Sequence, residues 1–139
     1  MPERIFVDTL FVIALINQRD QYHQQATELA EALAGYPLLI TDAVLLEIGN
    51  GLSRNYKQEA VQIIKQFLAA DEVEVIHLNP ELFEQAFDLY QTHQDKAWGL
   101  VDCISFVVMR ESGVSRALTF DRHFKQAGFQ ALMIASPQA

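Results

Sequence analysis

Short apolar runs alternate with longer amphipathic segments along nearly the whole chain, and this alternation limits the available folds more than any other feature of the sequence. The runs with the length and composition of β-strands are RIFVD (residues 4–8), PLLIT (37–41), VEVIHL (73–78), RALTF (116–120) and FQALMI (129–134). Because helical segments separate these runs, the strands must be joined by crossover connections. The sequence therefore predicts an α/β fold with a mostly parallel sheet that helices cover on both faces.

Between these runs, apolar residues recur at the three- and four-residue spacing of amphipathic helices. We predict helices over residues 22–35, 43–54, 59–70, 79–93, 101–112 and 122–127. Gly35 and Gly113 follow or end two of these segments, as is common at helix C-termini, and Asn79 followed by Pro80 is a typical helix start. No repeat or linker interrupts the pattern, so we expect one domain over residues 1–139.

Composition narrows the class of protein further. Half of the 139 residues are hydrophobic, which is enough for one compact core and argues against disorder. The first residues, MPERIF, carry charges of both signs, and no apolar window is long enough to span a bilayer, so we expect a soluble, unexported protein without membrane contact. The single cysteine, Cys103, excludes an internal disulfide and a zinc site built on thiolates, and it fits a reducing cytoplasm.

The net charge of the chain limits which partners it can attract over long range. The formal net charge is -8, which opposes long-range attraction to a polyanion. If the partner is a nucleic acid, a bound cation or a local basic patch must therefore reverse the field near the binding site.

Acidic residues stand where a parallel sheet presents functional groups. Asp8 and Asp121 end strand runs, Asp102 opens a helix that is apolar on nearly all sides, and Glu47 lies on or beside the apolar face of its helix. In open parallel sheets, ligands bind at the carboxyl ends of the strands. Each acid alone also fits a structural role, since the three aspartates precede helices and would cap them, and Glu47 fits a solvated helix position.

The combination of these acids predicts more than each acid does alone. Carboxylates that converge on a dry site repel one another, and the repulsion raises at least one pKa unless a cation is present. A divalent ion removes this conflict, and carboxylate ligands favour Mg²⁺ or Mn²⁺ over zinc or copper. We therefore predict a Mg²⁺ or Mn²⁺ site at this edge of the sheet, where the ion can accept phosphate oxygens and activate a water as nucleophile.

Four blocks of the sequence together resemble the PIN domain family, and most closely the small single-domain PIN proteins of the VapC-type toxin group. The blocks are FVDTLFVIALIN (residues 6–17), LLEIGN (45–50), WGLVDCISFVVMRESG (98–113) and ALTFDRHFKQAGF (117–129), in the family's order. The resemblance implies a five-stranded parallel sheet between helices and a metal-dependent endoribonuclease that leaves phosphate on the 5′ product. It also implies that a small antitoxin protein blocks the groove and that the chain forms a homodimer.

By this resemblance, Asp8, Glu47, Asp102 and Asp121 correspond to the family's acidic quartet, which would be both the catalytic and the metal-binding residues. One departure concerns the residues before the third acid. Many relatives carry hydroxyl residues there, whereas this chain has Gly99 and Val101. A missing hydroxyl would affect helix capping and the efficiency of catalysis, while leaving the acids intact.

Several other residues are open to two interpretations. Thr9 and Thr119 fit either hydroxyls that support the acids or ordinary residues at strand ends. His123 fits local hydrogen bonding or packing better than general base catalysis, and Trp98 and Phe106 fit core or subunit contacts better than base stacking. The basic residues that could flank the acidic site, or lie on solvated faces, are Arg54, Lys57, Arg110, Arg116, Arg122 and Lys125.

Other α/β proteins with acids at strand ends fit less well. A phosphoacceptor response domain needs an acidic pair near the end of the first strand and a lysine after the last, and the sequence supplies neither. A phosphatase with an aspartate nucleophile needs a second aspartate where Leu10 stands. A catalytically inactive PIN-like module that binds other proteins is the remaining alternative, and metal binding would distinguish it from an enzyme.

Overall fold

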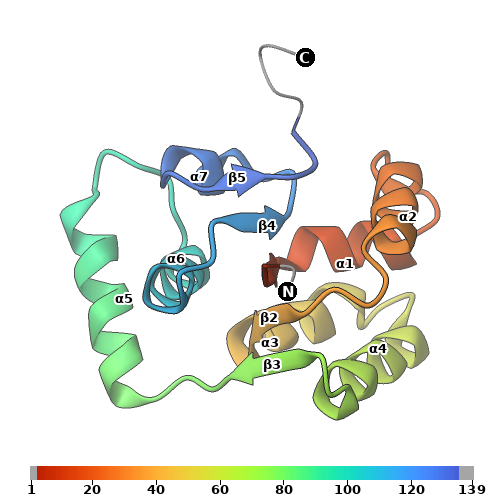
Figure 1. The fold of residues 1–139 in the computed structure, drawn as a ribbon. Helices are drawn as coiled ribbons and strands as arrows, with labels where there is room; N and C mark the ends of the chain where they lie inside the picture. Colours follow the sequence, from red (N-terminus) through yellow and green to blue (C-terminus); the bar gives the residue numbers. More distant parts are fainter. Residues whose placement is uncertain (1–2, 135–139) are drawn as a thin grey trace.

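The computed structural model describes residues 3–134 (Figure 1). The elements run in the order β1 (Ile5–Val7), α1 (Thr9–Ile16), α2 (His23–Ala32), β2 (Leu38–Thr41), α3 (Asp42–Leu52), α4 (Lys57–Ala69), β3 (Val73–Ile76), α5 (Pro80–Thr92), α6 (Leu100–Ser112), β4 (Arg116–Leu118), α7 (Arg122–Gln126) and β5 (Gln130–Ala131). The predicted alternation of strands and helices is confirmed.

The sheet has five strands in the order β3-β2-β1-β4-β5, and every pair is parallel. The register pairs Phe6 of β1 with Leu39 of β2 on one side and with Ala117 of β4 on the other. The chain leaves the central strand in one direction through β2 and β3, then returns to place β4 on its other side. A topological switch point therefore lies between β1 and β4, and this is where open parallel sheets bind their ligands.

Helices cover both faces of the sheet. Right-handed crossovers put α1 to α4 on one face and α5 to α7 on the other, and Figure 1 shows α1, α2 and α4 across the sheet from α5, α6 and α7. With both faces covered, the central strand lies fully inside, and Ile5, Phe6 and Val7 are all 0% exposed. This burial explains why β1 is a continuous apolar run rather than an alternating one.

Local signals explain several helix boundaries. The side chain of Asn79 accepts a hydrogen bond from the Leu82 N–H, as expected for the cap of α5. Gly113 ends α6 with a left-handed backbone conformation, φ 68°, which favours glycine. Thr41 caps α3 in the same way as Asn79 caps α5, through the Val44 N–H.

Two segments differ most from the sequence prediction, and the other predicted boundaries differ from those of the structure by up to three residues. Helix α1, Thr9–Ile16, was expected only as a helix that Asp8 precedes and was given no range, because its residues are apolar on all sides and give no helical periodicity. The last strand was predicted over residues 129–134, but β5 contains only Gln130–Ala131. Past it, the amides of Leu132 and Met133 still donate to the β4 segment, and the Ile134 amide turns back to the Ala131 carbonyl, which ends the strand.

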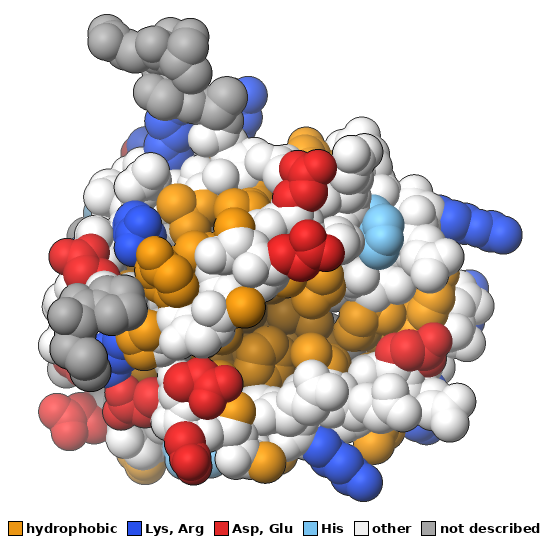
Figure 2. Space-filling model, turned by 45° about the vertical axis from the view of Figure 1, so that its right-hand side comes forward, with side chains coloured by type: hydrophobic (Ala, Val, Ile, Leu, Met, Phe, Trp, Pro, Cys, Tyr) orange, Lys and Arg blue, Asp and Glu red, His pale blue; other side chains and the backbone are white. Residues whose placement is uncertain are grey.

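The chain has more acidic than basic residues, 18 Asp and Glu against 10 Lys and Arg. On the face drawn in Figure 2, acidic side chains lie around a hollow with hydrophobic side chains on its floor, and Lys and Arg lie toward the edges of the view. Within residues 3–134, no helix has the length and apolar character needed to cross a bilayer.

Candidate active site

A cavity of about 420 Å³ opens at the switch point between β1 and β4, and its lining contains all the acids singled out in the sequence. The lining residues are Asp8, Thr9, Leu10, Glu47, Asn50, Asp102 and Asp121. They come from the β1–α1 junction, from α3, from the first turn of α6 and from the β4–α7 junction. Parallel strand ends and helices from both faces of the sheet thus bring together residues that are more than a hundred positions apart in the sequence.

Asp8 is the most deeply placed of these acids, with 5% of its surface exposed. Its Oδ2 accepts a hydrogen bond of 2.7 Å from the Thr119 hydroxyl. Burial is the main cause that raises the pKa of Asp8 from 3.8 to about 7; the Thr119 hydrogen bond opposes the rise, and the nearby charges of Asp102 and Asp121 add to it. The site therefore holds this carboxylate in its charged form only at a free-energy cost when no cation is present.

Thr119 links two of the acids. Besides donating to Asp8, its oxygen accepts a hydrogen bond of 3.0 Å from the Asp121 N–H, and the residue is 0% exposed. The strand end alone would not require a hydroxyl at this buried position. The structure favours the interpretation of Thr119 as a residue that supports the acids.

Replacing Thr119 by Val should destabilise the protein by about 1–3 kcal/mol, because the buried Asp8 carboxylate loses its donor and the Asp121 amide loses its acceptor. Urea unfolding at pH 8 in chelator measures the effect. Thr119→Ser is the matched control, since it keeps the hydroxyl, and it should stay close to the parent. Equal stability of the Val and Ser variants would contradict the role of the hydroxyl.

Glu47 reaches the cavity from α3, where it is partly exposed. The Thr9 hydroxyl donates a hydrogen bond of 2.6 Å to Glu47 Oε1. Because Thr9 itself is 7% exposed and fixed at the start of α1, this bond orients a glutamate that would otherwise sample many rotamers. Thr9 and Thr119 thus each donate to one acid of the cavity, Glu47 and Asp8 respectively.

Asp102 and Asp121 meet across the junction of α6 and α7. Asp102 Oδ2 accepts a hydrogen bond of 3.1 Å from the Gly99 N–H, and Asp121 Oδ1 accepts one of 2.9 Å from the His123 N–H as the cap of α7. Desolvation raises the pKa of Asp102, while the hydrogen bond from His123 lowers it. Gly99 therefore contributes its backbone amide, although it lacks the hydroxyl that many relatives carry there.

The prediction that these aspartates would cap helices holds for Asp121 and, through its bond with the N-cap residue Gly99, for Asp102, but not for Asp8. Asp8 occupies the cap position of α1, but its side chain makes no capping hydrogen bond and accepts from Thr119 instead. Asp102 lies inside the first turn of α6 and reaches back to Gly99. Helix capping therefore does not account for the buried Asp8 carboxylate.

The closest grouping of potential ligand atoms involves a residue that sequence reasoning did not select as a ligand. Within residues 3–134, one oxygen each of Asp102 and Asp121 and one ring nitrogen of His123 lie within 4.8 Å of one another. Asp8 and Glu47 line the cavity but stand outside this group. Asn50 was also missed, and its spacing of three residues from Glu47, one helical turn, was the available signal.

The structure distinguishes between the two interpretations of Trp98, Phe106 and the basic residues. Trp98 is 6% exposed, its Nε1 donates to the Gln126 side chain, and its ring meets the edge of Phe106, which is 0% exposed. Both rings therefore belong to the core and are not free to stack on bases.

Among the residues that the structure describes, none of the six basic side chains considered above lines the acidic cavity. Arg122 and Lys125 line a separate depression beside α7.

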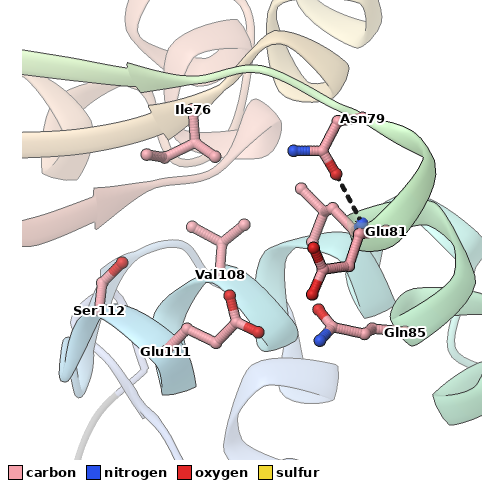
Figure 3. A pocket seen from close by; sticks show the side chains of 8 residues that line it. Ile76, Asn79, Glu81, Gln85, Val108, Glu111 and Ser112 are labelled. Atoms are coloured by element: carbon pink, nitrogen blue, oxygen red, sulfur yellow. Dashed lines mark hydrogen bonds between the residues drawn. The ribbon is translucent and has the colours of Figure 1, made fainter.

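A second depression, of about 190 Å³, lies between the end of β3 and helices α5 and α6 (Figure 3). Glu81, Gln85 and Glu111 face it, and the Asn79 side chain there is occupied in capping α5. It is smaller than the acidic cavity, lies away from the switch point, and contains none of the acids predicted from the sequence. The cavity between β1 and β4 is therefore the stronger candidate.

Comparisons with known proteins agree with this geometry. The family model described as "PIN domain" matches residues 5–130. The chain is 35% identical over 126 residues to the "23S rRNA-specific endonuclease VapC20" of Mycobacterium tuberculosis (strain ATCC 25618 / H37Rv), covering 90% of this chain and 95% of the relative. It is 24% identical over 130 residues to a "VapC ribonuclease" of Aquifex aeolicus (strain VF5), covering 91% and 93%.

A solved structure also resembles the chain. The crystal structure of Mycobacterium tuberculosis VapC20, described as a sarcin-ricin loop cleaving toxin, superposes with a TM-score of 0.81 at 33% identity, over 90% of this chain and 95% of that one. The family match and the fold agree with the resemblance and the five-stranded parallel sheet expected from the sequence. The chain belongs to the PIN domain family and is a protein of its VapC type.

Proposed function

We propose that this chain is a metal-dependent endoribonuclease that hydrolyses RNA phosphodiester bonds as the toxin of a toxin–antitoxin pair. The observation that carries the proposal is the convergence of Asp8, Glu47, Asp102 and Asp121 on one cavity at the switch point of the sheet. The relatives named as VapC endonucleases or ribonucleases cover at least 90% of the chain, which supports the same activity here. In this proposal the acidic quartet provides the catalytic residues, and residues 1–139 act as one PIN domain.

The donor set fits Mg²⁺ or Mn²⁺, because it consists of carboxylate oxygens, which both ions prefer. Burial is the main cause that raises the pKa of Asp8, and the nearby charges of Asp102 and Asp121 add to the rise, so a cation beside these acids would favour the charged form of Asp8. In our proposal the four acids hold the ion. When bound, such an ion polarises the phosphate and lowers the pKa of a bound water.

The proposal also gives roles to Thr9, Thr119 and Asn50. The hydroxyls of Thr9 and Thr119 fix the orientation of Glu47 and Asp8, so that little reorganisation is needed when the substrate enters. Asn50 carries the uncharged amide in the lining, which can donate to a phosphate oxygen or a ribose hydroxyl. Because the lining contains no basic residue, attraction of the RNA backbone falls to the cation and to side chains outside the cavity, such as Arg122 and Lys125.

We infer the RNA substrate and the protein partners by analogy with the relatives. We propose structured RNA as the substrate, and 23S rRNA as the first RNA to test, since one relative is named as specific for it. An acidic enzyme gains little from bulk charge, so recognition should depend on the shape and unpaired bases of a loop. We also propose a small antitoxin that covers the cavity, a homodimer, and action in the cytoplasm, all by analogy with VapC-type proteins.

Mapping cleavage sites tests this proposal. Purified protein with Mn²⁺ or Mg²⁺ should cut 23S rRNA, free or in ribosomes, at one or a few loop positions that primer extension detects, and it should leave tRNA intact. Uniform degradation of every RNA would contradict recognition of a structured loop. Binding of the metal without cleavage of any RNA would favour a catalytically inactive interaction module.

A further inference from the structure

We propose that His123 is a further ligand of the ion that the four acids hold, and that it joins Asp102 and Asp121 at the rim of the acidic cavity. The nitrogen ligand would shift metal preference from Mg²⁺ toward Mn²⁺. This inference rests on the proposed metal-dependent function and adds to it a residue outside the acidic quartet. The imidazole does not line the cavity, so it reaches the two carboxylates from outside the space shared by Asp8 and Glu47.

The inference rests on the distances between the His123 ring nitrogen and two carboxylates. His123 Nδ1 lies 2.9 Å from Asp102 Oδ2 and 3.4 Å from Asp121 Oδ1. The contact between Nδ1 and Asp102 is a hydrogen bond, and the capping bond from the His123 N–H to Asp121 Oδ1 holds the second oxygen beside the ring, so both carboxylates stay close to one ring nitrogen. Neighbouring ligand atoms around an octahedral ion with bonds of about 2.1 Å lie about 3 Å apart. The three side chains are therefore already spaced as ligands of one ion.

The surroundings hold these side chains in place. Asp121 is fixed by its capping bond with the His123 N–H, and Asp102 by its bond with the Gly99 N–H. Helix α7 is anchored by Phe124, which is 0% exposed and meets Phe106 edge to face at 5.0 Å. His123 itself is accessible, with 28% of its side chain exposed, so a cation from solvent can reach it.

The chemistry of the donor set predicts its selectivity. Mg²⁺ strongly prefers oxygen ligands, whereas first-row transition ions accept imidazole nitrogen readily. An imidazole binds an ion through a ring nitrogen that carries no proton. A site with carboxylates and one imidazole should therefore favour Mn²⁺ over Mg²⁺ more strongly than carboxylates alone.

The test uses Mn²⁺ as a paramagnetic probe of the whole protein. We expect pulsed EPR of the Mn²⁺-loaded parent to show ¹⁴N coupling from a directly bound imidazole, and expect this signal to be absent from His123→Asn. The asparagine amide keeps a donor for Asp102 but offers no ring nitrogen. Titration calorimetry with each metal should show the preference for Mn²⁺ over Mg²⁺ reduced by about tenfold in the variant.

His77→Asn is the matched control, because His77 also lies near an aspartate, 3.3 Å from Asp42, but away from the cavity. It should leave both the nitrogen signal and the metal preference unchanged. Mn²⁺ binding without nitrogen coupling in the parent, or an unchanged preference in His123→Asn, would overturn the ligand assignment and leave the proposed nuclease intact. Absence of any metal binding would overturn both.

Discussion

Asp102→Asn abolishes RNA cleavage while the fold is retained, if the acidic cavity is the active site. Asp102 lines the cavity and also contacts the His123 ring. Its carboxylate lies near those of Asp8 and Asp121. Mutating even an outer partner of a metal ligand lowers affinity or activity by about 10- to 100-fold, so loss of a direct ligand should lower the cleavage rate by more than about 100-fold. Initial rates on a labelled RNA measure this.

The Asp102→Asn substitution should preserve the local structure. In this variant the side-chain oxygen of the new asparagine can still accept from the Gly99 N–H, so the first turn of α6 keeps its hydrogen bond. Asp88→Asn is the control, because it removes the same charge from an exposed position on α5, away from the cavity. Circular dichroism and thermal unfolding confirm that both variants are folded. Cleavage by Asp102→Asn at the parent rate would contradict the assignment.

The stability of the metal-free protein should fall as the pH rises from about 4 to about 7, and Asp8 should be a main cause. The pKa of Asp8 is raised from 3.8 to about 7, chiefly by burial. Between these values the folded protein holds a proton that the unfolded chain has lost, so the free energy of unfolding decreases with pH. A difference of about three pKa units corresponds to about 4 kcal/mol, fully expressed above pH 7.

Asp8→Asn removes this penalty. In chelator at pH 8 the variant should be more stable than the parent by up to about 4 kcal/mol, and the difference should vanish near pH 4, where Asp8 is neutral in both states. Urea unfolding across this pH range measures it, with Asp88→Asn again as the control for removal of one carboxylate. A parent that gains stability relative to Asp8→Asn as the pH rises would contradict the burial of a charged Asp8.

Sequence patterns were sufficient for the architecture because the elements carry strong local signals. Asn79 and Pro80 start α5, Gly113 ends α6, and the apolar β1 run reads as a central strand. Helix α1 was given no range for a physical reason. It lies between the sheet and neighbouring helices, so its apolar residues form no single stripe and its periodicity disappears.

The acidic site residues were accessible from sequence because two of them follow strand ends, while Asp102 begins an apolar helix and Glu47 lies beside the apolar face of another. Asp8 and Asp121 were found from the strand ends, and parallel pairing of β1 with β4 makes them neighbours. The finer arrangement depends on tertiary geometry. The approach of His123 to Asp102 requires α7 to pack against α6, and the Thr119 bridge requires the register of β4 against β1. No spacing in a single sequence specifies those contacts.

The most direct test of the central claim is RNA cleavage by chelator-treated protein before and after Mg²⁺ or Mn²⁺ is added. The proposed site predicts no cleavage in chelator, recovery with either ion at concentrations that saturate binding, and no recovery in Asp102→Asn purified in the same way. Cleavage that continues at full rate in chelator, or that Asp102→Asn shows equally, would contradict a nuclease whose four carboxylates act through a divalent cation.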